Sequence, residues 1–143
     1  MSSKRETVLA AVETLIQTAL PHADIARNRT KAKSVGPGGT VLIEDGEPGD
    51  PEVDLCPLNY TYSHRIPLTI GAYESASLTP EQVLDTMQQA IGAAVAADRT
   101  LGGLCEWLEP EAPDSFALDV VGAVSGRWST PAIIAVYSTP NPL

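Results

Sequence analysis

Few residues of this sequence stand in a spacing that catalysis or phosphate binding requires. The glycine-rich stretch at 35–40, VGPGGT, lacks the Lys-Ser or Lys-Thr ending of a P-loop and precedes an expected strand rather than a helix. Ser125 stands on an expected turn beside Gly126, but Ala123 replaces the glycine that a nucleophile elbow needs two residues earlier. The sequence therefore favours neither nucleotide binding nor a serine nucleophile.

The histidines and cysteines form no motif either. His22 and His64 have no carboxylate or second ligand at a readable spacing, and His64 falls on the apolar face of an expected strand, where a hydrogen-bonded core histidine is common. Cys56 and Cys105 stand far apart beside apolar residues, which is more typical of small buried or part-buried side chains than of a disulfide framework or a metal site. We predict no catalytic residue, no metal and no cofactor. A Ser-His-Asp site assembled from distant positions stays an open alternative.

Charge excludes one large class of partners. The chain carries 18 acidic and 9 basic residues, a net charge of −9, and only 5% aromatic residues. Such a surface repels phosphate backbones and offers few stacking platforms, so specific nucleic-acid binding is not expected. Glu13 and Gln17 interrupt the first apolar stretch, and the longest apolar runs are too short to span a bilayer. We predict no membrane partner and folding in a cytoplasm.

The charged residues are unevenly distributed along the chain. Residues 24–39 predict a flexible basic arm, because they have almost no apolar anchor and end in glycines and a proline. Residues 44–57 predict an acidic loop. Arm and loop could pair within one subunit, or the arm could reach the acidic loop of a neighbouring copy and set the register of a ring. The candidate interface residues are Arg27, Arg29, Lys31, Lys33, Glu44, Asp45, Glu47, Asp50, Glu52 and Asp54.

Two helices should frame the fold. The first begins with Ser3 and Glu6 as a capping box, carries an apolar stripe from Val8 to Leu20, and stops at Pro21. The second has Thr79 as N-cap, Pro80 at the first helical position and Gln82 completing a capping box, and runs to about Arg99.

Four strands are expected, at 40–44, 60–70, 116–124 and 128–138, with the last two joined as a hairpin near Ser125 and Gly126. Pro67 predicts that the second strand lies at a sheet edge or is bulged. Residues 139–143 should be a tail. The result is one α+β domain over 1–143, a mostly antiparallel sheet of about four strands with two helices packed on one face.

The order of these elements resembles one known family. The segments TVLIEDGEP, YTYSHRIPLTI, IGAAVAADRTLGGLCEWLEPEAP and WSTPAIIAVYST look like the tail-terminator family of long-tailed bacteriophages, the U-like minor tail proteins, from about Thr7 to Thr139. The arm at 24–39 and Pro67 do not map onto the family pattern.

The resemblance implies a small structural subunit rather than an enzyme. Six copies would form a ring that caps the tail tube, stops its elongation and presents a surface to the head-side connector protein. DNA would pass through an acidic lumen without specific binding. The protein would be assembled in the host cytoplasm and reside in the virion, at the head-proximal end of the tail.

Two alternatives stay open. A neck or tail-completion protein that joins tail to head would be built in the same way. A small acyl-transferring or hydrolytic enzyme would instead be a monomer or dimer with a reactive Ser125 or Cys105.

Overall fold

The computed structural model describes residues 2–28, 38–73, 77–113, 116–121 and 124–143. Three of the candidate interface residues, Arg29, Lys31 and Lys33, therefore lie outside the described residues.

Both predicted helices are confirmed, as α1 (Lys4–Ala19) and α2 (Pro80–Ala97). Their starts follow from local chemistry. The Thr79 side chain accepts from the N–H of Gln82, whose side chain accepts from the N–H of Thr79, so this capping box is complete. The Ser3 hydroxyl accepts from the N–H of Glu6, but the Glu6 carboxylate turns to Arg27 instead of back to Ser3. The first capping box is therefore only half formed.

The described residues contain eight strands, twice the predicted number, and one short 3₁₀ helix, η1 (Leu101–Gly103). The class is α+β, and the sheet is mixed because β1 and β2 are parallel while the other pairs are antiparallel. The strands are β1 (Asp24–Arg27), β2 (Thr40–Ile43), β3 (Glu52–Leu55), β4 (Leu58–Tyr73), β5 (Trp107–Glu111), β6 (Phe116–Val121), β7 (Val124–Ser129) and β8 (Ala132–Thr139).

Strand β4 is the centre of the sheet, not its edge. On one side it pairs with β3 and then β2, and on the other with β8 and then β7. The edge position predicted from Pro67 is wrong. The Pro67 carbonyl accepts from the N–H of Glu44, just past the end of β2. In an antiparallel pair, the N–H and C=O groups of one residue face the same neighbouring strand. The nitrogen of Pro67, which has no hydrogen to donate, therefore faces the chain just past the end of β2, where no strand requires a donor.

The C-terminal strands differ from the prediction in their boundaries. A β6–β7 hairpin is present, but Val121 pairs with Val124, so Ser125 and Gly126 lie inside β7 rather than in a turn. β7 and β8 both pair with β4 in the same antiparallel register, so they run in line along it with a break at 130–131. Thr139 belongs to β8, which leaves only 140–143 as the predicted tail.

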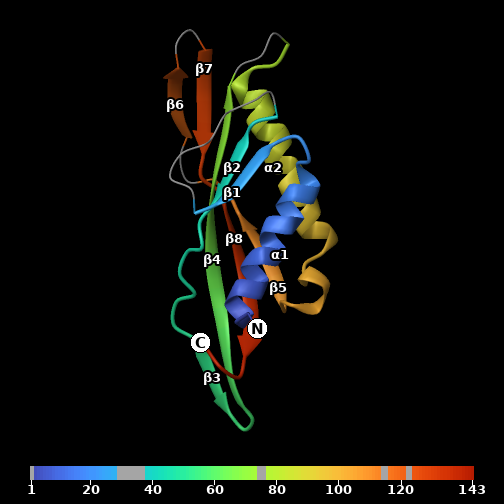
Figure 1. The fold of residues 1–143 in the computed structure, drawn as a ribbon, viewed down its shortest axis with the longest axis vertical. Helices are drawn as coiled ribbons and strands as arrows, with labels where there is room; N and C mark the ends of the chain where they lie inside the picture. The colour runs from blue at the N-terminus through green and yellow to red at the C-terminus, as the bar shows by residue number, and fades with distance from the viewer. Residues whose placement is uncertain (1, 29–37, 74–76, 114–115, 122–123) are drawn as a thin grey trace.

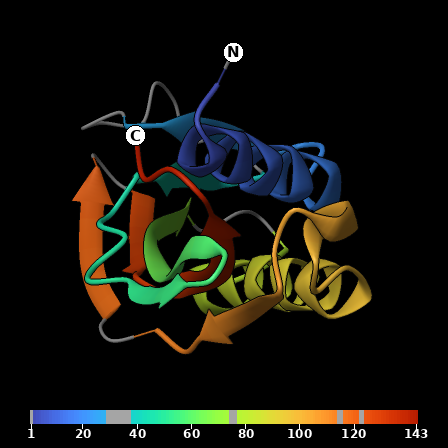
Figure 2. The ribbon, with the colours of Figure 1, turned by 90° about the horizontal axis from the view of Figure 1, so that it is seen from below.

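Both helices lie on the same face of the curved sheet (Figures 1 and 2). The predicted alternation of β4 is confirmed, because the even-numbered side chains from Tyr62 to Ile70 are buried against the helices. The core combines these with the helix stripes and the inward residues of β2, β5 and β8. Its largest side chains include Leu9, Ile16, Ile43, Ile66, Leu68, Ile70, Leu84, Leu108, Ile133 and Tyr137.

Two glycine–aromatic pairs join β4 to β7. Gly71 is opposite Trp128, and Gly126 is opposite Tyr73. A Cβ atom on Gly71 would lie 2.5 Å from the Trp128 ring, and one on Gly126 would collide with the Tyr73 ring. Each glycine therefore leaves the space that the aromatic ring of the opposite strand fills.

We expect Gly71→Ala to lower the free energy of unfolding by about 1–3 kcal/mol, because the added methyl group must displace the Trp128 ring. Gly92→Ala in α2 is the control: apart from its chain neighbours and the backbone of α2 itself, no atom lies within 4 Å of its added Cβ, so it should raise that free energy by about 0.5–1 kcal/mol. Urea denaturation measures both, and an unchanged Gly71→Ala variant would contradict the role of this glycine.

Candidate functional site

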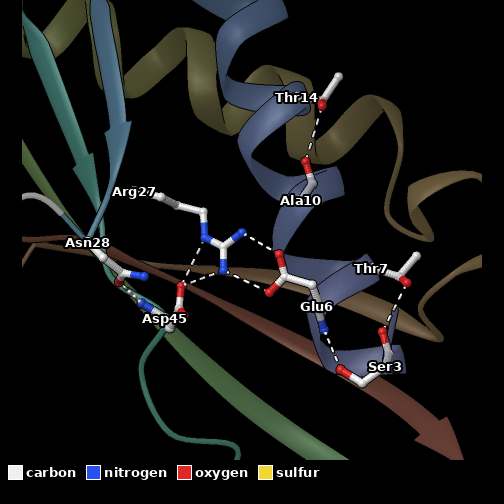
Figure 3. A network of polar contacts seen from close by, with 8 residues as sticks. All are labelled: Ser3, Glu6, Thr7, Ala10, Thr14, Arg27, Asn28 and Asp45. Carbon is white, nitrogen blue, oxygen red and sulfur yellow. Dashed lines mark hydrogen bonds and ion pairs between the residues drawn. The ribbon is translucent and has the colours of Figure 1, made fainter. Parts of the chain in front are cut away.

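Arg27 connects three elements through one guanidinium group (Figure 3). Its Nη1 and Nη2 donate to the two carboxylate oxygens of Glu6 on α1, at 2.8 and 3.0 Å, and its Nε donates to Asp45 Oδ1 at 2.9 Å. The bond from Arg27 lowers the pKa of Glu6. Residues 24–27, predicted as the start of a flexible arm, are thus strand β1, anchored at its end to α1 and to the chain after β2.

The end of β1 is fixed to the end of β2 as well. Asn28 has a positive φ of 57°, a conformation that asparagine tolerates better than most residues. Its N–H donates to the Ile43 carbonyl at 2.7 Å, and its side-chain oxygen accepts from the N–H of Asp45 at 3.1 Å (Figure 3). Two of the candidate interface residues, Arg27 and Asp45, therefore pair within one subunit.

The same residue, Asp45, reaches the core through its backbone. His64 is fully buried on β4, with Nε2 2.5 Å from the Asp45 carbonyl and Nδ1 2.8 Å from the Tyr137 hydroxyl. A carbonyl can only accept, so Nε2 carries the proton and Tyr137 donates to Nδ1. The hydrogen-bonded core histidine is confirmed. Burial lowers the pKa of His64 and raises that of Tyr137 to about 12, so both are neutral at pH 7.

Beyond this network, β3 and the start of β4 form a hairpin that projects from one end of the sheet (Figure 1). Its register places Val53 opposite Tyr60 and Leu55 opposite Leu58, so these four residues share one face. Val53, Leu55 and Leu58 are 47%, 76% and 46% exposed. We call these three residues the hairpin apolar face. The opposite face is polar and carries Glu52, Asp54, Asn59 and Thr61.

The loop predicted at 44–57 is therefore partly strand. Glu52 and Asp54 belong to β3, and Glu47 forms an isolated bridge with Arg65 of β4. The alternation E-V-D-L at 52–55 could have revealed this strand, but the surrounding prolines, glycines and acids favoured a loop. Among the described residues, five candidate interface carboxylates are exposed and make no ion pair: Glu44, Glu47, Asp50, Glu52 and Asp54.

For the enzyme alternative, the structure describes the side chains of Cys105, His22 and His64, whereas the side chain of Ser125 lies outside what it describes. Cys105 is buried, and burial raises the pKa of its thiol to about 11, which disfavours the nucleophilic thiolate. His22 is exposed, whereas His64 is held inside the core. Within the described part of the chain, no three His, Cys, Asp or Glu residues could hold a metal ion together. No described helix is both long and apolar enough to cross a membrane.

No protein-family model matches the chain, and no curated protein matches it.

We expect the buried neutral His64 to make stability fall below pH 6.5. Its pKa is below the ordinary value of 6.5 in the folded state, so the unfolded chain binds the proton first as the pH falls. The free energy of unfolding should be largest above pH 6.5 and fall as the pH drops below 6.5, by at most about 1.4 kcal/mol per pH unit. His64→Gln should flatten this slope in urea titrations, whereas His22→Gln should keep it. An equally steep slope in His64→Gln would show that another group titrates.

We expect Arg27→Gln to lower the free energy of unfolding, because it breaks the bonds of α1 and of the chain after β2 to β1. The loss should shrink in 1 M NaCl, since the two carboxylates are partly exposed. The control is Arg127→Gln, which removes an ion pair to the more exposed Glu81 and should cost less. Equal losses in both variants would mean that the Arg27 network adds nothing beyond a surface ion pair.

Proposed function

We propose that this chain is a structural subunit that assembles with copies of itself through the β3–β4 hairpin, and that it serves as a phage tail terminator. The observation that supports self-assembly is the hairpin apolar face. Three large apolar residues on one face of a projecting two-stranded ribbon remain 46–76% exposed within the described chain. Such a surface is costly in water and is typical of an interaction site.

The same chain offers a surface of matching chemistry elsewhere. A groove of about 290 Å³ lies between α2, β4 and the chain around Pro110, Pro113 and Pro131. Leu68, Ile70 and Ile91 contribute to its mainly apolar lining. We propose that the hairpin of one copy packs in this groove of the next. Because the two surfaces differ, the contact is heterologous, and a heterologous contact that closes makes a ring.

The ion pairs of Arg27 favour the hairpin, rather than the basic arm, as the contact between copies. Arg27, the described cation of the arm, is already bound to Glu6 and Asp45 of its own subunit. The exposed carboxylates of 44–54 add to the net charge of −9, and a ring with an acidic lumen would let DNA slide through without specific binding.

The role in the tail rests on the sequence resemblance, with which the α+β class is compatible. It supplies the partners of the proposal: a ring, hexameric in the family, that caps the tail tube, stops its elongation and meets the head-side connector in the virion. A neck or tail-completion protein is the second candidate. A terminator binds the end of the tube made by the tail tube protein, whereas a neck protein binds the connector first.

We expect Leu55→Ser to weaken self-assembly by about 10- to 100-fold, the loss that corresponds to one buried leucine side chain. Asp54→Ser is the matched control, because it changes the adjacent residue on the polar face. Both positions are exposed, so both variants should fold. Sedimentation velocity measures assembly, with and without the tail tube protein, and negative-stain images show whether rings cap tube ends. A wild-type chain that stays monomeric beside its tube protein would refute the proposal.

A further inference from the structure

Four of the described strands are paired along one edge only: β1 with β2, β3 with β4, β5 with β8, and β6 with β7. An unpaired edge presents backbone N–H and C=O groups that can pair with another chain, so natural proteins commonly block or cover such edges. The four edges of this sheet differ in how they are protected.

One hydrogen bond fixes which backbone groups face which neighbour. The N–H of Leu68 in β4 donates to the carbonyl of Pro131, in the register that β7 and β8 share. Because backbone groups alternate between the two sides of a strand, the even-numbered residues of β4 bond to β7 and β8. Carried on by the pairing of these strands, the alternation points the even-numbered backbone groups of β5 and β6 to the unpaired edges.

Two of the four edges are protected. β1 packs against α1, where Glu6 holds Arg27, the last residue of the strand. The outward backbone groups of β5 belong to Leu108 and Pro110. Pro110 has no N–H to donate, and the Leu108 carbonyl accepts from Nη1 of Arg99 at 2.8 Å. The edge of β5 therefore has little left with which to pair another strand.

The edges of β3 and β6 have no such protection. Neither strand contains a proline, and no other described strand pairs with either edge. On β6, the N–H and C=O groups of Phe116, Leu118 and Val120 face away from β7. These two strands therefore keep backbone groups that suit the addition of a further strand.

The two open edges lie too far apart to meet within one subunit. β3 pairs with β4 as far as Thr61, whereas β7, the neighbour of β6, first pairs with β4 at Ile70 and on its other side (Figure 1). The β4 residues between these places span roughly 30 Å. A contact between the two edges therefore joins one copy to the next, and it is heterologous because the edges differ.

The groove proposed for the hairpin lies beside the β6 edge. Glu111, which ends β5, and Pro113, which precedes Phe116 of β6 by three residues, both line it. A second hollow, which shares Gln88 and Pro113 with the groove, continues along α2 to Arg127 of β7, the strand next to β6. A hairpin seated in the groove therefore lies next to the open edge of β6.

We infer that β3 of one copy adds to the β6 edge of the next through backbone hydrogen bonds, so that the sheet continues from subunit to subunit. This inference rests on the self-assembly proposed above and names the strand that receives the hairpin. The three residues of the hairpin apolar face are few against the roughly 20–30 residues that each partner contributes to a stable interface. Strand pairing supplies the additional contact.

Hydrogen exchange of the assembled wild-type chain tests the inference without a substitution in β6. The outward amides of Phe116, Leu118 and Val120 should exchange at least tenfold more slowly in the assembly than in the Leu55→Ser variant, measured where that variant is monomeric. Asp54→Ser, which keeps the hairpin apolar face, should retain the protection. Mass spectrometry of peptides covering 116–121 measures the exchange.

A backbone substitution gives a second measurement. Leu118→Pro removes one outward N–H and leaves the bonds of β6 to β7 in place, so it should weaken assembly about tenfold, the effect of a lost backbone hydrogen bond. Leu118→Ala is the matched control, because it also removes the leucine side chain but keeps the N–H. The tenfold loss is measured against this control by sedimentation velocity.

Outward amides of 116–121 that exchange as fast in the wild-type assembly as in the monomer would overturn the inference, as would a Leu118→Pro variant that assembles like Leu118→Ala. The proposed self-assembly through the hairpin would survive both results if Leu55→Ser still separated the copies. A wild-type chain that forms no assembly would overturn both the inference and the self-assembly on which it rests.

Discussion

The hydrogen-bonded ladder of β4 is the interaction on which the rest of this fold depends. This strand is sixteen residues long and is paired along both of its edges, with β3 and β2 on one side and β8 and β7 on the other. Its inward side chains, from Tyr62 to Ile70, form the floor of the core under both helices. A buried backbone needs its hydrogen bonds, so a residue without an N–H fits β4 best where one partner strand ends. Pro67 lies at such a point, just past the end of β2.

The polar network around Arg27 and Asp45 attaches the remaining elements to this strand. Arg27 joins β1 to α1, and the Asp45 carbonyl accepts a hydrogen bond from the buried His64 on β4. Each buried polar group of this network thereby has a partner, which removes the cost of burying it. The network also decides the electrostatics of the surface, because it neutralises Arg27 and leaves Lys4 and Arg5 as the described cations without an ion pair.

The projecting hairpin follows from the length of β4. One strand of the hairpin is the start of β4, whose later residues lie in the core, so the hairpin apolar face is preorganised. A contact made by a preorganised surface loses less conformational entropy than a contact made by a mobile loop.

The sequence by itself determined the elements whose signals are local. Capping at Ser3 and Thr79 defined both helices, and the even-numbered alternation from Tyr62 to Ile70 defined the inward face of β4, because capping bonds and side-chain period depend only on residues close in the chain. It also led to the class α+β and to a core histidine, but only to about half of the strands.

Only the tertiary structure decided the rest, because the decisive partners are distant in sequence. β1, β3 and β5 have four or five residues each, too short a pattern to outweigh the turn and loop signals around them, and they become strands through pairing with β2, β4 and β8. No spacing could show that Arg27 would bind Glu6 and Asp45. Those groups meet because the sheet brings its strands together, and a side chain's partner is chosen in space rather than along the chain.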